Sequence, residues 1–166
     1  MNNNKSLLTV LIVISAINLL LTTWLVFQPH SQPGSNNEMN HARSLPAELS
    51  AQKRQALFEQ VKKLYNAEDI DGLYLLFSPD VRVQLSKAEF DSTIRKLKAT
   101  FNNIEDGAYS NYEFVGRQGG KAYYSLNYVV RFPKSSISEK GSLKIGLTVA
   151  EGNVGIYGIY LNSLAQ

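Results

Sequence analysis

The spacing of the hydrophobic residues changes once along this chain, near Tyr109, and this change restricts the fold more than any other feature. Before it, apolar residues recur every three or four positions, as on one face of a helix. After it, apolar and polar residues alternate over several segments, as in strands that bury one face. Helices followed by an antiparallel meander are typical of an α+β domain. We therefore expect an α+β roll in which three helices pack on a curled antiparallel sheet.

The helical part begins after Pro46. Its first helix ends near Asn66 and has an apolar face made of Leu57, Val61, Leu64 and Tyr65. Asp69 caps a short second helix, "IDGLYLLF", and the capping box from Ser86 to Glu89 opens a third. The buried stripe of the third helix comprises Phe90, Ile94, Leu97 and Phe101. Between the second and third helices, "DVRVQLS" alternates like a brief strand.

The part after Tyr109 predicts four main strands, in addition to the short one. We expect them at residues 109–116, 121–132, 142–150 and 154–162, joined by "RQGG", "PKSSISEKG" and "EGN". In the last hairpin, a turn at Gly152 and Asn153 would pair Val149 with Ile156 and Leu147 with Gly158. This register predicts two faces: Ile156 and Tyr160 toward the helices, and Tyr157, Ile159 and Leu161 on the outside. Because a strand that is apolar on both faces needs both covered, the outer face is the predicted surface for a homodimer or another partner.

A second feature, an uncharged apolar stretch at residues 7–27, sets the expected topology. Its length matches a helix that crosses a hydrocarbon core of about 30 Å. A cleaved signal peptide is the alternative, but the stretch exceeds a signal-peptide core and no small-residue cleavage site follows it. Lys5, in the short tail of residues 1–6, is the only charged side chain before the stretch, and no cation follows until Arg43. We expect a single-pass signal-anchor in the inner membrane, with a cytoplasmic N-terminus and a periplasmic domain.

Ser15, Asn18 and Thr22 lie on one face of this predicted membrane helix, since they are three and four positions apart. Such a polar face either contacts a second helix in the membrane or is simply tolerated, with Ser and Thr bonding their own backbone. Residues 28–46 carry three prolines and no apolar period, so we interpret them as a flexible linker before a domain at residues 47–166.

Composition excludes several classes of function. The chain has no cysteine, so thiol catalysis, disulfides and thiolate metal sites are absent. His30 and His41 both fall in the linker without other ligand-type residues around them, and we expect neither a metal nor another cofactor. A formal charge of +3 without a basic run argues against nucleic acid as a partner.

The stretch "LYNAEDIDGLYLLFSPDVRVQL", from Leu64 to Leu85, resembles the signature of the NTF2-like superfamily. In that signature a helix ends in an Asn-Ala-x-Asp turn, followed by "D-G-L-x-x-L-F" and "D-V-x-V". The expected order of elements over residues 47–163 is also similar. The resemblance implies a cone-shaped core inside the roll, but one fold hosts many functions.

Because the NTF2-like superfamily includes enzymes, the resemblance first raises the possibility of catalysis. Isomerases of the superfamily carry a tyrosine and a base aspartate at positions that fall here on Val61 and at or beside Leu85, and neither of these residues transfers a proton. The histidine of its dehydratases has no counterpart, because no histidine lies in the domain. Glu113 and Arg131 are the only pair of acidic and basic side chains that we place near each other on the sheet. We expect them on its outer face as a solvated ion pair. We therefore expect no enzyme activity.

Two functions remain open. In the first, the domain acts through protein-protein interaction as an assembly or accessory subunit of an envelope complex. The single-span topology resembles the NTF2-like subunit of type IV secretion machinery, without its Asn-Pro loop motif. The final hairpin resembles short extracytoplasmic NTF2-like domains of unknown function. In the second, the cone binds a small apolar ligand, oriented by four tyrosines that otherwise fill the core: Tyr112, Tyr124, Tyr128 and Tyr160.

Overall fold

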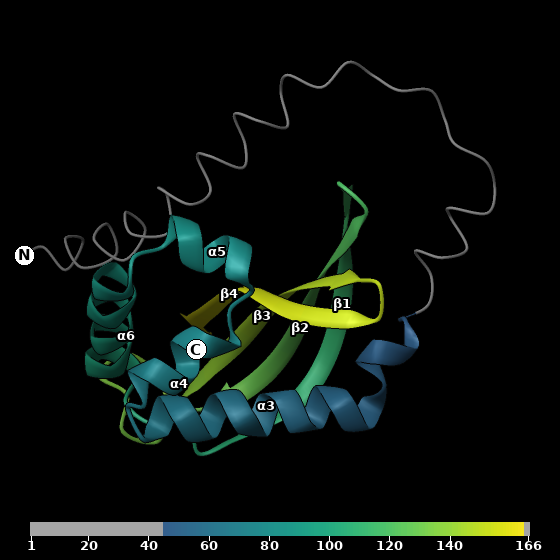
Figure 1. Cartoon of the computed structure of the whole chain (residues 1–166). Helices are drawn as coiled ribbons and strands as arrows, with labels where there is room; N and C mark the ends of the chain where they lie inside the picture. Colours follow the sequence, from purple (N-terminus) through teal and green to yellow (C-terminus); the bar gives the residue numbers. More distant parts are fainter. Residues whose placement is uncertain (1–44, 165–166) are drawn as a thin grey trace, which may run out of the picture. The chain divides into compact units, whose positions relative to one another are not determined.

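The computed structural model describes residues 45–164, which form an α+β domain (Figure 1). A short 3-10 turn, η1 (Ala47–Leu49), leads into four helices: α3 (Ala51–Asn66), α4 (Ile70–Leu76), α5 (Pro79–Gln84) and α6 (Lys87–Phe101). Four strands follow: β1 (Asp106–Gln118), β2 (Lys121–Arg131), β3 (Lys140–Ala150) and β4 (Asn153–Ser163). The predicted order of helices before strands is confirmed.

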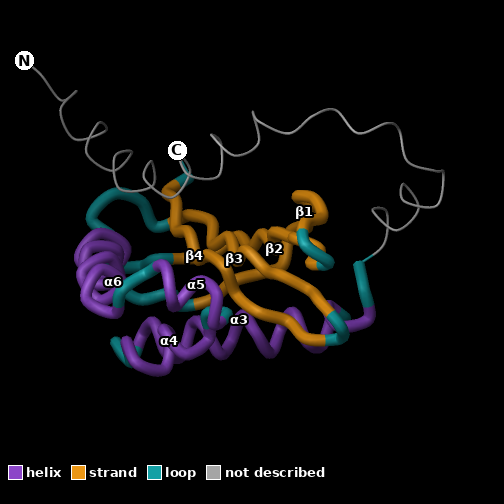
Figure 2. Tube along the Cα trace, turned by 45° about the horizontal axis from the view of Figure 1, so that its top comes forward, coloured by secondary structure: helices purple, strands orange, loops and turns teal. Residues whose placement is uncertain are grey.

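The strands form one antiparallel sheet in the order β1-β2-β3-β4. Helices α3, α4 and α6 lie against one face of this curled sheet, α3 runs across it, and α5 begins at the edge of the sheet beside β4 (Figures 1 and 2). Between the two layers lies a continuous apolar core, in which Phe58 and Val61 of α3 meet Leu126 and Tyr128 of β2. Because the sheet is curled, its helix-facing side is concave and its other side is an outer face.

Two of the predicted helix starts have the capping contacts that their sequences indicate. The Asp69 carboxylate accepts a hydrogen bond from the Gly72 N–H at 2.8 Å, and α4 begins at the next residue. Ser86 and Glu89 form the reciprocal capping box at the start of α6. These bonds satisfy N–H groups that have no partner within a helix, so they fix where each helix begins.

The prediction of a brief strand at "DVRVQLS" is wrong, because this segment is helix α5. Ser78 occupies the N-cap, Pro79 the first helical position and Asp80 the first turn, an arrangement that favours a helix start. Val83 is 88% exposed, so the alternation that predicted a strand does not bury a face. One parallel bridge, between Phe77 and Ile156, is the only strand-like pairing of this region with the sheet. The described sheet therefore has four strands, and four α-helices precede it in place of three.

The final hairpin differs from the predicted register. Its turn is formed by Glu151 and Gly152, whose φ angles are 51° and 77°, as a type I′ turn requires. Leu147 therefore pairs with Ile156 in place of Gly158, which puts an apolar partner opposite a buried leucine. The next pair is Gly146 with Gly158, so Tyr157 has no partner on β3 and forms a β-bulge. This β-bulge reverses the faces of all β4 residues after it.

The beginning of the described chain adds a small correction to the predicted linker. Leu45 already packs against the core, so the domain includes the last residues of the segment that we interpreted as linker. Within residues 45–164 we find no helix with the length and apolarity needed to cross a membrane. The predicted membrane helix at residues 7–27 lies outside the described residues, as do Ser15, Asn18 and Thr22.

Candidate functional site

Three of the four tyrosines that we considered for a ligand cavity, Tyr112, Tyr124 and Tyr128, lie on the concave side of the sheet. Tyr128 is 1% exposed, stacks on Phe58 with ring centroids 4.9 Å apart, and donates a hydrogen bond to the Arg54 carbonyl at 2.9 Å. Tyr124 is also buried and lies between Tyr112 and Phe114 of β1. Burial raises the pKa of both Tyr124 and Tyr128, so their hydroxyls stay protonated. These rings contribute to the packing between the sheet and the helices.

Of the four tyrosines predicted to line a ligand cavity, only three lie on the same side of the sheet. Tyr112 pairs with Leu126 and packs at the edge of the core, on the same side as Tyr124 and Tyr128. Tyr160, in contrast, lies on the outer face, because it follows the bulge at Tyr157 and pairs with Lys144. Its predicted place on the helix-packed side is therefore wrong.

The outer face of the sheet is the second candidate site. Of the three residues predicted there, Tyr157 lies on it, since its ring contacts Tyr123 at a centroid distance of 5.7 Å. Ile159 and Leu161 do not. Leu161 is 3% exposed in the core, and Ile159 packs against the core opposite Ile145. The prediction for these two residues is wrong because the bulge adds one residue to β4, and side chains alternate between faces with a period of two.

A pair of glycines shapes the outer face. Gly146 of β3 and Gly158 of β4 pair across the two strands, and both are buried. A Cβ atom on Gly146 would lie 2.5 Å from Cζ of Tyr157, and one on Gly158 would lie 2.6 Å from the Tyr160 hydroxyl oxygen. The two tyrosine rings therefore rest on backbone that has no side chains. With Tyr123 of β2 they form what we call the tyrosine platform: Tyr123, Tyr157 and Tyr160 above Gly146 and Gly158.

Polar groups surround this platform. The register places Glu113 and Gly146 on either side of Ser125, and Asn111 and Lys144 on either side of Asn127. The Asn127 amide donates to the Asn111 side chain at 2.6 Å, and Lys144 lies 3.4 Å from Glu113. Ser125 is 4% exposed and, apart from the tyrosines, is the only buried polar residue among those that the structure describes.

Two of the platform tyrosines, Tyr157 and Tyr160, have raised pKa values. Burial raises the pKa of Tyr157, and a hydrogen bond with Ser125 only partly opposes this rise. Burial also raises the pKa of Tyr160, with a smaller contribution from Tyr157. The centre of the outer face is thus aromatic and uncharged, whereas its ion pair, Lys144 with Glu113, lies beside it.

The residues that the sequence comparison with isomerases singled out are apolar in the structure. Val61 is 1% exposed in the core, and Leu85 follows α5 and packs against the core. Glu113 and Arg131 are both exposed, as expected, but they do not pair with each other. Glu113 meets Lys144, and Arg131 contacts Glu105 and Asp106. Within the described part of the chain, no group of three His, Asp or Glu side chains is close enough to hold a metal ion.

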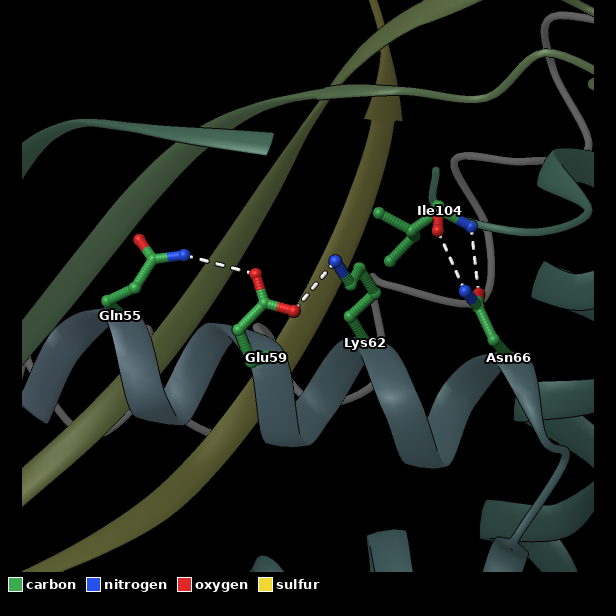
Figure 3. Close-up of polar contacts among 5 residues, drawn as sticks. All are labelled: Gln55, Glu59, Lys62, Asn66 and Ile104. Atoms are coloured by element: carbon green, nitrogen blue, oxygen red, sulfur yellow. Dashed lines mark hydrogen bonds and ion pairs between the residues drawn. The ribbon is translucent and has the colours of Figure 1, made fainter. Parts of the chain in front are cut away.

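The junction between α3, α6 and β1 contains the Asn of the Asn-Ala-x-Asp turn. The Asn66 side chain donates to the Ile104 carbonyl at 2.7 Å and accepts from the Ile104 N–H at 2.9 Å (Figure 3). Lys98 of α6 donates to the carbonyls of Tyr65 and Asn66, at the negative end of α3. Desolvation lowers the pKa of Lys98. A surface hollow of about 300 Å³ lies beside this junction, lined in part by Asn66, Asn103 and Lys134.

The exposed side of α3 carries a separate chain of polar contacts. The Gln55 amide donates to Glu59 at 3.1 Å, and Glu59 pairs with Lys62 at 2.7 Å (Figure 3). Pairs three or four residues apart on a helix stabilise it by a few tenths of a kcal/mol. These contacts therefore support the helix and do not form a site.

Sequence reasoning missed Tyr123, Ser125 and the paired glycines as parts of the outer face. One signal was present: in β2 the residues on either side of the buried Tyr124 must point outward, which includes Tyr123 and Ser125. The pairing of Gly146 with Gly158 had no such signal, because it depends on the position of the bulge.

Comparisons with known proteins give a structural likeness but no match in sequence. No protein-family model matches the chain, and no curated protein matches it. Among solved structures, it is similar to Aln2 from a Streptomyces species, with a TM-score of 0.47 and 10% sequence identity. The similar region covers 72% of this chain and 94% of the Aln2 chain. The fold of the described residues is thus defined by their own elements, helices followed by a four-stranded antiparallel sheet.

Proposed function

We propose that this chain is a membrane-anchored, periplasmic NTF2-like domain that acts by binding other proteins and not by catalysis. In this proposal residues 7–27 hold it in the inner membrane, and the domain serves as an assembly or accessory subunit of an envelope complex. The observation that carries the proposal is the tyrosine platform on the outer face of the sheet. Helices α3, α4 and α6 pack on the other side, so the protein partner, a second copy or an envelope protein, contacts this face.

The chemistry of the platform supports this role. Tyrosines are enriched at the energetically important centres of protein interfaces, because they bury large rings and keep a polar tip. Here the rings are held against glycine backbone and against each other, which lowers the entropy lost when a partner binds. Asn111, Asn127 and the Lys144 pair with Glu113 supply a polar border, as interfaces usually have around an apolar centre.

The NTF2-like assignment is supported by the order of elements and by the motif from Leu64 to Leu85. The Asn of its Asn-Ala-x-Asp turn fastens α3 to Ile104, just before β1, and Asp69 caps α4. In this sequence Asn66 and Asp69 of the motif therefore help to build the fold. The apolar Val61 and Leu85 support the same interpretation.

The alternative function, a small apolar ligand in the cone, has weaker support. Tyr128 and Tyr124 would have to leave contacts with Phe58, Tyr112 and Phe114 to admit a ligand. Tyr160, the fourth residue of the predicted cavity, lies on the outer face. The protein-binding role therefore uses the side chains as they are arranged.

The test is the assembly state of the full chain extracted from membranes in a mild detergent. We expect Tyr157→Glu to weaken association at least about tenfold, because it places a charge in the centre of the platform. Val83→Glu is the matched control, since it adds the same charge at an 88% exposed residue of α5, which is not part of the sheet. Sedimentation would report a homodimer, and affinity capture with mass spectrometry would report an envelope partner.

Two outcomes would contradict the proposal. In the first, Tyr157→Glu keeps the wild-type circular dichroism spectrum and also the wild-type mass and partners. In the second, native mass spectrometry of the same preparation shows a bound small molecule and no protein partner, which favours the ligand-binding alternative. If Tyr157→Glu unfolds the domain, Lys144→Glu at the border of the platform repeats the test with a smaller change to packing.

A further inference from the structure

We draw no further inference here: the strongest candidate, the tyrosine platform on the outer face of the sheet, is the surface on which the proposed function already rests, and nothing in the structure shows which molecule covers it.

Discussion

Asn66 joins two distant parts of the chain through a single side chain. Its amide exchanges two hydrogen bonds with the backbone of Ile104, as a neighbouring strand would, and Ile104 is 1% exposed. This contact explains why an asparagine stands at the end of α3: only a side chain with both a donor and an acceptor satisfies both groups.

We expect Asn66→Ala to lower the free energy of unfolding by about 2 kcal/mol, because it leaves two buried backbone groups of Ile104 without partners. Asn103→Ala is the control. The exposed Asn103 side chain accepts a hydrogen bond only from Lys98, so its loss should lower the free energy of unfolding by less than about 1 kcal/mol. Urea unfolding followed by circular dichroism measures both. Equal stability of the two variants would show that the Asn66 contact is not important.

Tyr65 presents the opposite case, a polar group without a visible partner. It is 2% exposed, and its hydroxyl has no hydrogen-bond partner among the described residues. Such a group costs free energy on folding, since it gives up water without receiving another bond.

We therefore expect Tyr65→Phe to leave the stability unchanged or to raise it by about 1 kcal/mol. Tyr128→Phe is matched to it in burial but removes a real bond, to the Arg54 carbonyl, and should lower the stability by about 1 kcal/mol. Chemical unfolding of the two variants distinguishes them. A loss for Tyr65→Phe as large as that for Tyr128→Phe would mean that the Tyr65 hydroxyl has a partner.

At the scale of single elements, β4 is the strand whose geometry determines the candidate site. The bulge at Tyr157 turns Ile159 and Leu161 into the core and places Tyr157 and Tyr160 together outside. It can do so because Gly146 and Gly158 leave room for the rings. A glycine that lies under an aromatic ring is a known way to fix strand register.

We expect Gly146→Ala to destabilise the domain by roughly 1–3 kcal/mol, because the new methyl group would overlap the Tyr157 ring. The control is the same change in a Tyr157→Ala background, where the ring is absent and alanine suits a strand at least as well as glycine. A double-mutant cycle measured by unfolding should give a coupling of about 1 kcal/mol or more. Additive effects of the two changes would contradict the described contact.

At the scale of the whole molecule, the buried tyrosines link stability to pH. Burial raises the pKa of five of them: Tyr65, Tyr124, Tyr128, Tyr157 and Tyr160. In the unfolded chain a tyrosine loses its proton near pH 10. Below that pH the tyrosines are neutral in both states. Above it the unfolded chain releases protons that the folded domain retains, so the free energy of unfolding falls.

We expect the urea midpoint of the full chain to be flat between about pH 8 and pH 9 and to fall steeply above about pH 10. Tyrosinate absorbance should rise mainly together with the loss of native circular dichroism. In the Tyr128→Phe variant the slope above about pH 10 should be smaller, since one of the shifted groups is absent. Titration of all the tyrosines near pH 10 in a domain that stays folded would contradict the burial described.

Local patterns in the sequence were sufficient for the order and type of most elements. The caps at Asp69 and Ser86 marked helix starts because their hydrogen bonds reach only two or three residues along the chain. The alternation after Tyr109 marked all four long strands, since it reflects one buried face. Tyr112, Tyr124 and Tyr128 were assigned to the correct face for the same reason.

The tertiary structure decided what lies beyond such local rules. The short segment from Pro79 to Gln84 satisfied both a strand pattern and a helix start, and the helix start prevailed. In β4, which is apolar on both faces, either phase of the alternation was compatible with the sequence. Pairing of Ile159 with Ile145 and of Leu161 with Leu143 buries aliphatic side chains in the core, and this selects the bulge at Tyr157. One extra residue then exchanged the faces of Ile159, Leu161 and Tyr160, because packing across the sheet, and not the order of residues, sets the phase of a strand.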